Sequence, residues 1–175
     1  RTRQRVSTFF DTGVVAYIGF ADPFCPELSP ILAEAAQPHA RVHTSGTMVV
    51  MEGPAFSTRA ESKMYRTWGG TVIGMTVLPE AKLAREAEIC YSSLSLVTDR
   101  DSWHSGEAVS VKTIVGHLDA NVAVAKKTRS GLVSMLPDAR SCECGSALSS
   151  AIITSRDKIS AQTRTRLGPI IDKYL

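Results

Sequence analysis

The sequence predicts an α/β fold with a mixed, mainly parallel twisted sheet flanked by helices. Short β-rich apolar runs alternate with segments of helical periodicity, which is typical of strand–helix–strand units. Glycine and proline separate these segments, and the chain contains no internal repeat or low-complexity tract. At 175 residues, of which 43% are hydrophobic and 21% charged, the chain suits one α/β domain over residues 1–175.

Local signals place elements in the first half of the chain. Pro26 stands near the start of a segment with apolar residues at helical spacing. Thr58 and Glu61 form a capping box, and the Gly69-Gly70 pair ends the helix that this box opens. The expected elements are strands at 14–20 and 47–51 and helices at 26–36 and 58–70.

The second half continues the alternation. Val72 and Ile73 form a buried strand, and Pro79 starts a helix whose alanines can face the sheet. Apolar residues recur at the spacing of an amphipathic helix from residue 111 onward. The expected elements are a strand at 72–74, a helix after Pro79, a strand at 89–97, helices along 111–122 and 147–155, and a polar, basic segment at 158–166.

Composition excludes several classes of partner. The net charge is +3, and lysine and arginine are spread among acids, so we expect no nucleic-acid partner. No run approaches the ~18 apolar residues that span a bilayer, and no signal peptide is visible, so we expect no membrane partner. We expect a cytoplasmic protein.

Polar residues follow two of the expected strands at the point where each strand ends. The strand at 72–74 runs into Met75 and Thr76, and the strand at 89–97 ends on Thr98-Asp99-Arg100-Asp101. Ligands of open α/β sheets bind outside the carboxyl ends of the strands, so Thr76 and Asp99 are candidate ligand contacts. The alternative is that these residues only form turns or cap helices.

Longer motifs extend this interpretation. They keep one order from about Arg1 to about Lys127 and resemble the 5'-methylthioadenosine phosphorylases, in the trimeric branch of the purine nucleoside phosphorylase family. The motifs are FADPFCPEL at 20–28, HTSGTMVVMEGP at 43–54, EGPAFSTRAESKMYRTWGG at 52–70, VIGMTVLPEAKLAREAEICY at 72–91, LVTDRDSW at 96–103 and EAVSV at 107–111.

The resemblance implies an activity and partners. The reaction would be phosphorolysis of 5'-methylthioadenosine to adenine and 5-methylthioribose 1-phosphate, in a homo-oligomer that is a trimer or a dimer of trimers. It needs inorganic phosphate as co-substrate and no metal or organic cofactor. The family's glycine-rich first strand-turn and Arg-His phosphate motif have no counterpart here, so we expect the C-terminal part of a longer phosphorylase. That absence also leaves open a non-catalytic ligand-binding or assembly subunit.

The resemblance assigns the purine contacts. Asp99 would share a proton with purine N7 and accept from the 6-amino group, and Asp101 would support it, although Asp101 could simply cap a turn. Phe56 would pack on the purine face, or else belong to the core. Ser57 stands where relatives that cleave inosine and guanosine carry a glutamate, which favours adenine.

The resemblance also assigns ribose, phosphate and 5'-substituent contacts. Thr76 would bind phosphate, and Met75 would lie under the ribose. Gly74 matches the branch that cleaves 6-oxopurines, which favours a broader-specificity purine nucleoside phosphorylase as an alternative. Tyr17 replaces a histidine that reaches a neighbouring subunit in many relatives. The other substrate-binding residues are Ile73, Thr98, Val111, Ile114 and Val115; the last three would form the wall of the 5' pocket or, alternatively, a helix core stripe.

The chain has four cysteines, Cys25, Cys90, Cys142 and Cys144. The C-x-C pair lacks a second pair or a histidine cluster at zinc spacing, so the sequence predicts no metal site. The four histidines are scattered, and we expect them to be surface or satisfied structural residues. Similarity to archaeal, thermophilic relatives implies disulfides Cys25–Cys90 and Cys142–Cys144; the alternative is two buried thiols and an exposed C-x-C.

Overall fold

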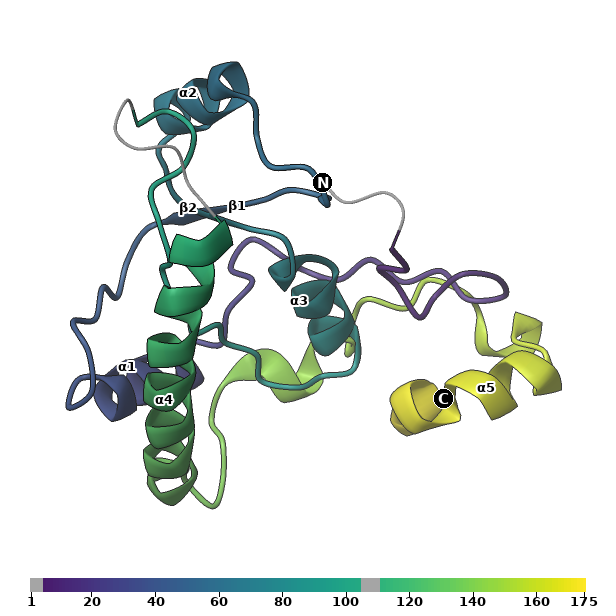
Figure 1. The fold of residues 1–175 in the computed structure, drawn as a ribbon. Coiled ribbons are helices and arrows are strands. Elements are labelled where there is room, and N and C mark those ends of the chain that lie inside the picture. Colours follow the sequence, from purple (N-terminus) through teal and green to yellow (C-terminus); the bar gives the residue numbers. More distant parts are fainter. Residues whose placement is uncertain (1–4, 105–110) are drawn as a thin grey trace.

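The computed structural model describes residues 5–104 and 111–175, and its class is α/β, as predicted (Figure 1). Strands β1 (Thr47–Val50) and β2 (Gly70–Gly74) pair in parallel, with Met48 opposite Val72 and Val50 opposite Gly74. Helix α2 (Arg59–Thr67) joins them, because parallel strands need a crossover connection. The predicted strands at 47–51 and 72–74 are therefore confirmed.

Helix α2 begins and ends where its sequence signals predict. The Thr58 hydroxyl accepts from the Glu61 amide at 3.2 Å, and the Glu61 carboxylate accepts from the Thr58 amide at 2.8 Å. This reciprocal pair satisfies two amides that the helix leaves without intrahelical partners. After the helix, Gly69 has a φ of +81°. Helices often end on a residue in this left-handed conformation, and that residue is usually glycine.

Three further helices lie in predicted segments: α1 (Leu28–Ala36), α3 (Val77–Glu86) and α4 (Val111–Met135). Figure 1 shows α1 beside the long α4, and the two pack against each other. Among the described residues, no helix combines the length and apolar character needed to cross a membrane.

Two predicted strands, at 14–20 and 89–97, are wrong. The first contains only an isolated antiparallel bridge between Ala16 and Ile152, and the second has no regular secondary structure. Strand formation depends on neighbours as much as on β-rich composition, and the described residues offer these runs no neighbouring strand. Apolar side chains in both runs are therefore exposed: Val15 by 50%, Tyr17 by 73%, Ile89 by 59% and Val97 by 68%.

The C-terminal elements also differ from the prediction. The expected helix at 147–155 is wrong, because Leu148 and Ala151 reach the core from a turn that follows η1 (Glu143–Ser146). A helix instead forms in the segment expected to be only polar, as α5 (Ala161–Ile171), with the Ser160 hydroxyl accepting from the Thr163 amide at 3.1 Å. Short 3-10 turns, η2 (Arg156–Lys158) and η3 (Asp172–Tyr174), flank it.

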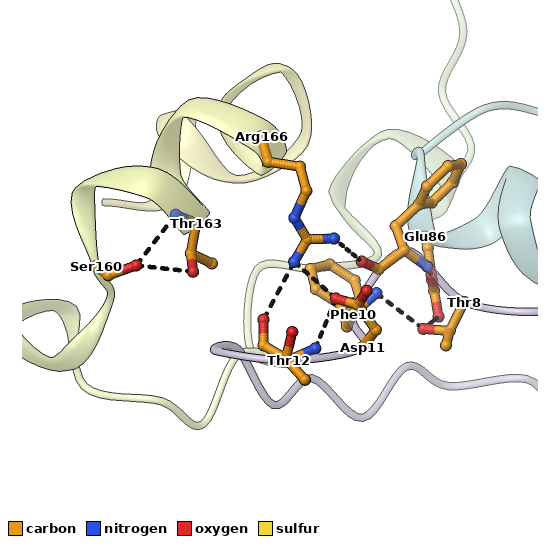
Figure 2. A network of polar contacts seen from close by, with 9 residues as sticks. Thr8, Phe10, Asp11, Thr12, Glu86, Ser160, Thr163 and Arg166 are labelled. Atoms are coloured by element: carbon orange, nitrogen blue, oxygen red, sulfur yellow. Dashed lines mark hydrogen bonds and ion pairs between the residues drawn. The ribbon is translucent and has the colours of Figure 1, made fainter.

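The main apolar core lies between the N-terminal segment and this C-terminal region. It contains Phe10, Val14, Leu148, Ala151, Leu167 and Ile171. Figure 2 shows the polar network beside it: Arg166 of α5 pairs with Asp11 at 2.6 Å and donates to the Thr12 carbonyl at 3.1 Å. The buried Glu86 at the end of α3 accepts from the Thr8 hydroxyl at 2.7 Å. Residues 8–12 are thereby fixed to both α3 and α5.

Candidate functional site

The end of β2 lies against the loop of residues 51–57, here called the 51–57 loop. The Met51 amide donates to the Gly74 carbonyl at 3.0 Å, so the loop starts where β2 ends. At Gly53, where φ is +70°, an added Cβ would lie 2.7 Å from the Met75 sulfur. Both the backbone conformation and this close approach favour glycine at position 53, where the Met75 side chain lies against the loop.

The 51–57 loop presents an aromatic ring to solvent. The Phe56 side chain is 70% exposed, so the alternative that it is a core residue is wrong for this structure. Ser57, next to it, is buried, and its hydroxyl donates to the Met51 sulfur at 3.4 Å. Arg5 lies 3.6 Å from the Glu52 carboxylate on the same loop. The loop therefore exposes the Phe56 ring to solvent while the Ser57 hydroxyl beside it is buried and hydrogen-bonded.

A second loop, residues 97–104, carries the acidic pair and is fastened to the beginning of α2. The Ser102 hydroxyl donates to the Ser57 carbonyl at 2.9 Å, and the Trp103 amide donates to the buried Ser62 hydroxyl at 3.1 Å. The Arg66 guanidinium lies 3.8 Å from the centre of the Trp103 ring, within cation–π distance. These contacts hold the 97–104 loop beside Phe56 and Ser57.

Within the 97–104 loop the first acid is accessible. Asp99 is exposed and accepts from the neighbouring Thr98 hydroxyl at 2.5 Å, while Asp101 is half-buried. A carboxyl in this position can exchange a proton with a ligand nitrogen or accept from an amino group. The exposed Asp99 carboxyl is therefore accessible to a ligand at this loop.

Helix α4 positions the start of the same loop through two polar residues that the sequence analysis did not assign to the site. His117 Nδ1 makes a short contact with the Thr98 carbonyl, and Asn121 Nδ2 donates to the Val97 carbonyl at 3.1 Å. His117 is thus a satisfied structural histidine, as predicted for the histidines in general. Their four-residue spacing places both side chains on one face of α4, but it does not indicate which segment that face contacts.

The apolar stripe of α4 is only partly covered. Val115 is 53% exposed, Leu118 47% and Val122 40%, while Ile114 is half-buried. The alternative that this stripe serves as core packing therefore fails for its exposed members in the described part of the chain. Val111 begins α4 but its side chain lies outside the described residues, as does most of the EAVSV motif at 107–111.

Thr76 lies immediately before α3. It occupies the N-cap position, is exposed, and makes no side-chain hydrogen bond to the helix. The alternative that Thr76 caps α3 through its hydroxyl is therefore wrong for this structure. Leu78 has non-helical dihedral angles (φ −105°, ψ 127°), so the regular turns of α3 begin after it, and Thr76 offers a ligand its exposed hydroxyl.

The structure brings part of the predicted set together. A hydrogen bond joins the acidic loop to Ser57, Met75 lies against Gly53 of the 51–57 loop, and Ile73 and Gly74 form the end of β2, where this loop starts. Two surface hollows, of about 560 and 360 Å³, lie along α5 and residues 6–11, and neither contains a predicted site residue. The candidate site is therefore an open edge of the sheet and not one of these hollows.

The four cysteines lie elsewhere, and all are free thiols. The disulfides Cys25–Cys90 and Cys142–Cys144 that the resemblance implied are not formed in this structure. The alternative of an exposed C-x-C is not realised either, since Cys144 is buried and Cys142 half-buried.

Comparison with known proteins decides the family. The Phosphorylase superfamily matches residues 2–134. The chain belongs to this superfamily. Its relatives include the S-methyl-5'-thioadenosine phosphorylases of Geobacter sulfurreducens, 54% identical over 98% of this chain and 60% of that protein, and of Koribacter versatilis, 51% identical over 99% and 60%. The chain therefore spans about 60% of the length of these curated relatives.

Solved phosphorylases share the fold. A methylthioadenosine phosphorylase from an antarctic soil metagenomic library is 43% identical with a TM-score of 0.90, covering 97% of this chain and 61% of that one. A mutant adenosine/methylthioadenosine phosphorylase from Schistosoma mansoni, in complex with methylthioadenosine, is 29% identical with a TM-score of 0.71, covering 80% and 56%. The α/β architecture of this chain is thus that of the superfamily.

Proposed function

We propose that this chain belongs to an enzyme that phosphorolyses 5'-methylthioadenosine to adenine and 5-methylthioribose 1-phosphate. The observation that carries the proposal is the fastening of the acidic 97–104 loop to the 51–57 loop, through the 2.9 Å bond from Ser102 to the Ser57 carbonyl. This bond joins the loop that carries the exposed Asp99 to the loop that carries the exposed Phe56 ring. Relatives of about 50% identity that are named for this activity support it.

The chemistry would centre on the departing purine. Cleavage of the bond between C1' and N9 leaves negative charge on the purine, and protonation at N7 by Asp99 would neutralise it. General-acid catalysis of this kind contributes about two to four powers of ten in rate. Phe56 would stack on the purine, and Asp101 would support Asp99 from the same loop. Two mutants of the Schistosoma mansoni adenosine/methylthioadenosine phosphorylase are solved in complex with adenine, which fits a 6-aminopurine product.

Ser57 and the α4 stripe would set specificity. A serine side chain is shorter than a glutamate and carries no charge, so it would not offer N1–H of a 6-oxopurine the carboxylate acceptor that glutamate does. The Ser57 hydroxyl instead donates to the Met51 sulfur. The exposed apolar surface of Val115, with Ile114 and Val111 near it in sequence, would receive the 5'-methylthio group. Burying that group would stabilise the complex by about 0.8 kcal/mol per methylene-sized unit.

Phosphate and assembly would involve more than these residues. Thr76, at the N-terminus of α3, would contribute one phosphate contact, with no metal or organic cofactor required. The remaining phosphate ligands would come from the part of the relatives' length that this chain does not span. Exposed Tyr17 and Val15 would be covered in a cytoplasmic homo-oligomer, a trimer or a dimer of trimers.

One observation favours a second candidate, a broader-specificity purine nucleoside phosphorylase. Gly74 ends β2 with open space where a side chain would stand, and it lacks the amide that the methylthioadenosine enzymes carry there. Such an enzyme would accept inosine as well as adenosine, because no side chain at position 74 discriminates between them.

Phosphorolysis assays distinguish these candidates. We would express the complete reading frame that contains these residues and measure kcat/KM with methylthioadenosine, adenosine and inosine. The proposal predicts the highest value with methylthioadenosine and the lowest with inosine. Comparable values with inosine would favour the broader enzyme, and no turnover with any nucleoside would favour a non-catalytic subunit.

A further inference from the structure

Four thiols from three separate segments of the chain meet at one point. Cys25 precedes α1, Cys90 follows α3, and Cys142 and Cys144 belong to the segment around η1. All four sulfur atoms lie within 4.8 Å of one another, and Cys25 and Cys144 are buried. Sequence spacing could not reveal this cluster, because Cys25 and Cys142 stand 117 residues apart.

The spacing of the sulfur atoms fits metal coordination. A zinc ion bonded tetrahedrally to four thiolates at ~2.3 Å holds neighbouring sulfur atoms ~3.8 Å apart. The Cys142 sulfur lies 3.7 Å from that of Cys25 and 3.4 Å from that of Cys90. Cys142 therefore has two near neighbours of similar distance, as a shared ion requires, and no exclusive partner as a disulfide requires.

Donors surround the sulfur atoms. The Leu28 amide donates to the Cys25 sulfur at 3.4 Å, and Arg140 Nη1 donates to the Cys90 sulfur at 3.6 Å and to the Glu88 carbonyl at 2.9 Å. Such hydrogen bonds orient ligands and favour the negatively charged thiolate that binds a metal. A positive guanidinium beside the cluster also offsets part of the charge of four thiolates.

Backbone contacts hold the three segments in place independently of the sulfur atoms. The Cys25 amide donates to the Tyr91 carbonyl at 2.7 Å, which ties the first segment to the second. The Ser141 amide donates to the Glu27 carboxylate at 3.1 Å, which ties the third segment to the first. The four thiols are thus positioned before any ion binds.

We propose that Cys25, Cys90, Cys142 and Cys144 bind one Zn²⁺ in a closed structural site. Each thiol releases its proton when it ligates the ion. Four protein ligands complete the tetrahedral shell and exclude substrate or water from the metal, so the ion stabilises and does not catalyse. Thiolates are soft ligands that select zinc over magnesium or calcium. The site fixes the C-terminal segment to α1 and α3, and it is independent of the proposed activity.

Metal analysis and cobalt exchange test this proposal on the whole protein purified under reducing conditions. We expect about one zinc per chain, and, after exchange, the intense visible bands of tetrahedral Co²⁺ with thiolate charge-transfer absorption. Removing the ion with a chelator should lower the thermal transition, and adding Zn²⁺ should restore it. If the protein contains one zinc but its cobalt-exchanged form lacks these thiolate bands, the ion is bound by other ligands and the proposal is wrong.

Variants assign the ligands. Cys144→Ser should abolish stoichiometric binding, whereas Ser149→Ala, an exposed change in the same segment, should leave it unchanged. If Cys144→Ser fails to fold, Arg140→Ala provides the second measurement, because loss of an outer-shell partner typically weakens metal affinity ~10–100-fold. Unchanged affinity in Arg140→Ala would contradict the arrangement.

Thiol chemistry supplies the opposing results. Zinc-containing protein is prepared without reductant and digested, and mass spectrometry of the peptides should show no disulfide. Disulfides Cys25–Cys90 and Cys142–Cys144 in that digest, iron in place of zinc, or four reactive thiols with no metal would each overturn the proposal.

Discussion

The open sheet edge and the C-terminal region differ in how completely their polar groups are satisfied. At the edge, Phe56 is 70% exposed, and Asp99 is exposed and accepts from the neighbouring Thr98 hydroxyl. Where the C-terminal region meets the end of α3, Glu88 is only 7% exposed. Its carboxylate accepts from the Leu148 amide at 2.9 Å, from the Tyr174 hydroxyl and from Lys173.

This difference indicates that the sheet edge serves ligand binding and that the contacts of Glu88 serve stability. A site that must admit a ligand keeps its apolar faces and carboxyls accessible, and it is drawn from the less stable parts of a protein. Glu88 instead joins the end of α3 to the segment around Leu148 and to η3, so its bonds hold together elements that are distant in sequence. Variants at the edge should therefore change activity with little change in stability, and variants around Glu88 should do the reverse.

The largest expected effect is at Asp99. We expect Asp99→Ala to lower kcat by about two to four powers of ten, because the departing purine loses its general acid. The unfolding midpoint should stay unchanged, since within residues 5–104 and 111–175 the Asp99 side chain bonds only to the neighbouring Thr98 hydroxyl. Asp138→Ala, an exposed acid remote in sequence, is the control in steady-state assays. A stable Asp99→Ala protein with normal turnover would remove Asp99 from the mechanism.

A smaller effect, on stability, is expected at Glu88. Glu88→Gln keeps the shape of the side chain but weakens its hydrogen bonds to Lys173 and Tyr174, and we expect a loss of about 1–3 kcal/mol. Denaturant unfolding measures the loss, and Glu143→Gln, an exposed glutamate in the same region, is the control. If both variants unfold at the same denaturant concentration, Glu88 is no more important than a surface acid.

The pH dependence of stability sharpens the same point. Burial raises the pKa of Glu88, but hydrogen bonds from Lys173, Tyr174 and the Leu148 amide outweigh burial and leave the pKa below its ordinary value. A lowered folded-state pKa contributes stability above the unfolded value of ~4.3, and this contribution is lost as pH falls through the folded pKa. Thermal melts of the parent and Glu88→Gln should therefore converge as the pH falls below this range. A constant difference between them at all pH values would contradict this assignment.

The smallest expected effect is at the capping box of α2. Thr58→Ala removes the acceptor of the Glu61 amide and should cost about 1 kcal/mol. Because α2 supports Trp103 through Ser62, KM should rise modestly while kcat is retained. Thr67→Ala, at the other end of the same helix, is the matched control for chemical unfolding. A Thr58→Ala variant as stable as the parent would show that the cap contributes nothing.

Sequence reasoning succeeded where the signal is local. The Thr58–Glu61 box, the left-handed Gly69 and the β1–α2–β2 unit all depend on neighbouring residues, and all are confirmed. The strands at 14–20 and 89–97 failed because a strand needs a partner, and β-rich composition does not supply one. Helix α5 was missed because its apolar residues are few, although Ser160 offered an N-cap signal.

The site was predictable to a similar extent. Motif resemblance identified the loops around Phe56 and Asp99, and the structure brings these loops together. His117 and Asn121 were not assigned to this region, because their role is to hold backbone carbonyls of another segment. The meeting of four cysteines was likewise hidden, since only the folded chain brings Cys25 and Cys90 to the C-x-C pair.

The effect of Asp99→Asn on base preference tests the central claim most directly. An asparagine amide can donate to the 6-oxo group of inosine, whereas a carboxylate can accept from the 6-amino group of adenosine. We predict that the complete enzyme prefers adenosine over inosine in kcat/KM and that Asp99→Asn lowers this ratio by tenfold or more. An unchanged ratio in a folded variant would contradict the account that Asp99 recognises and protonates the purine.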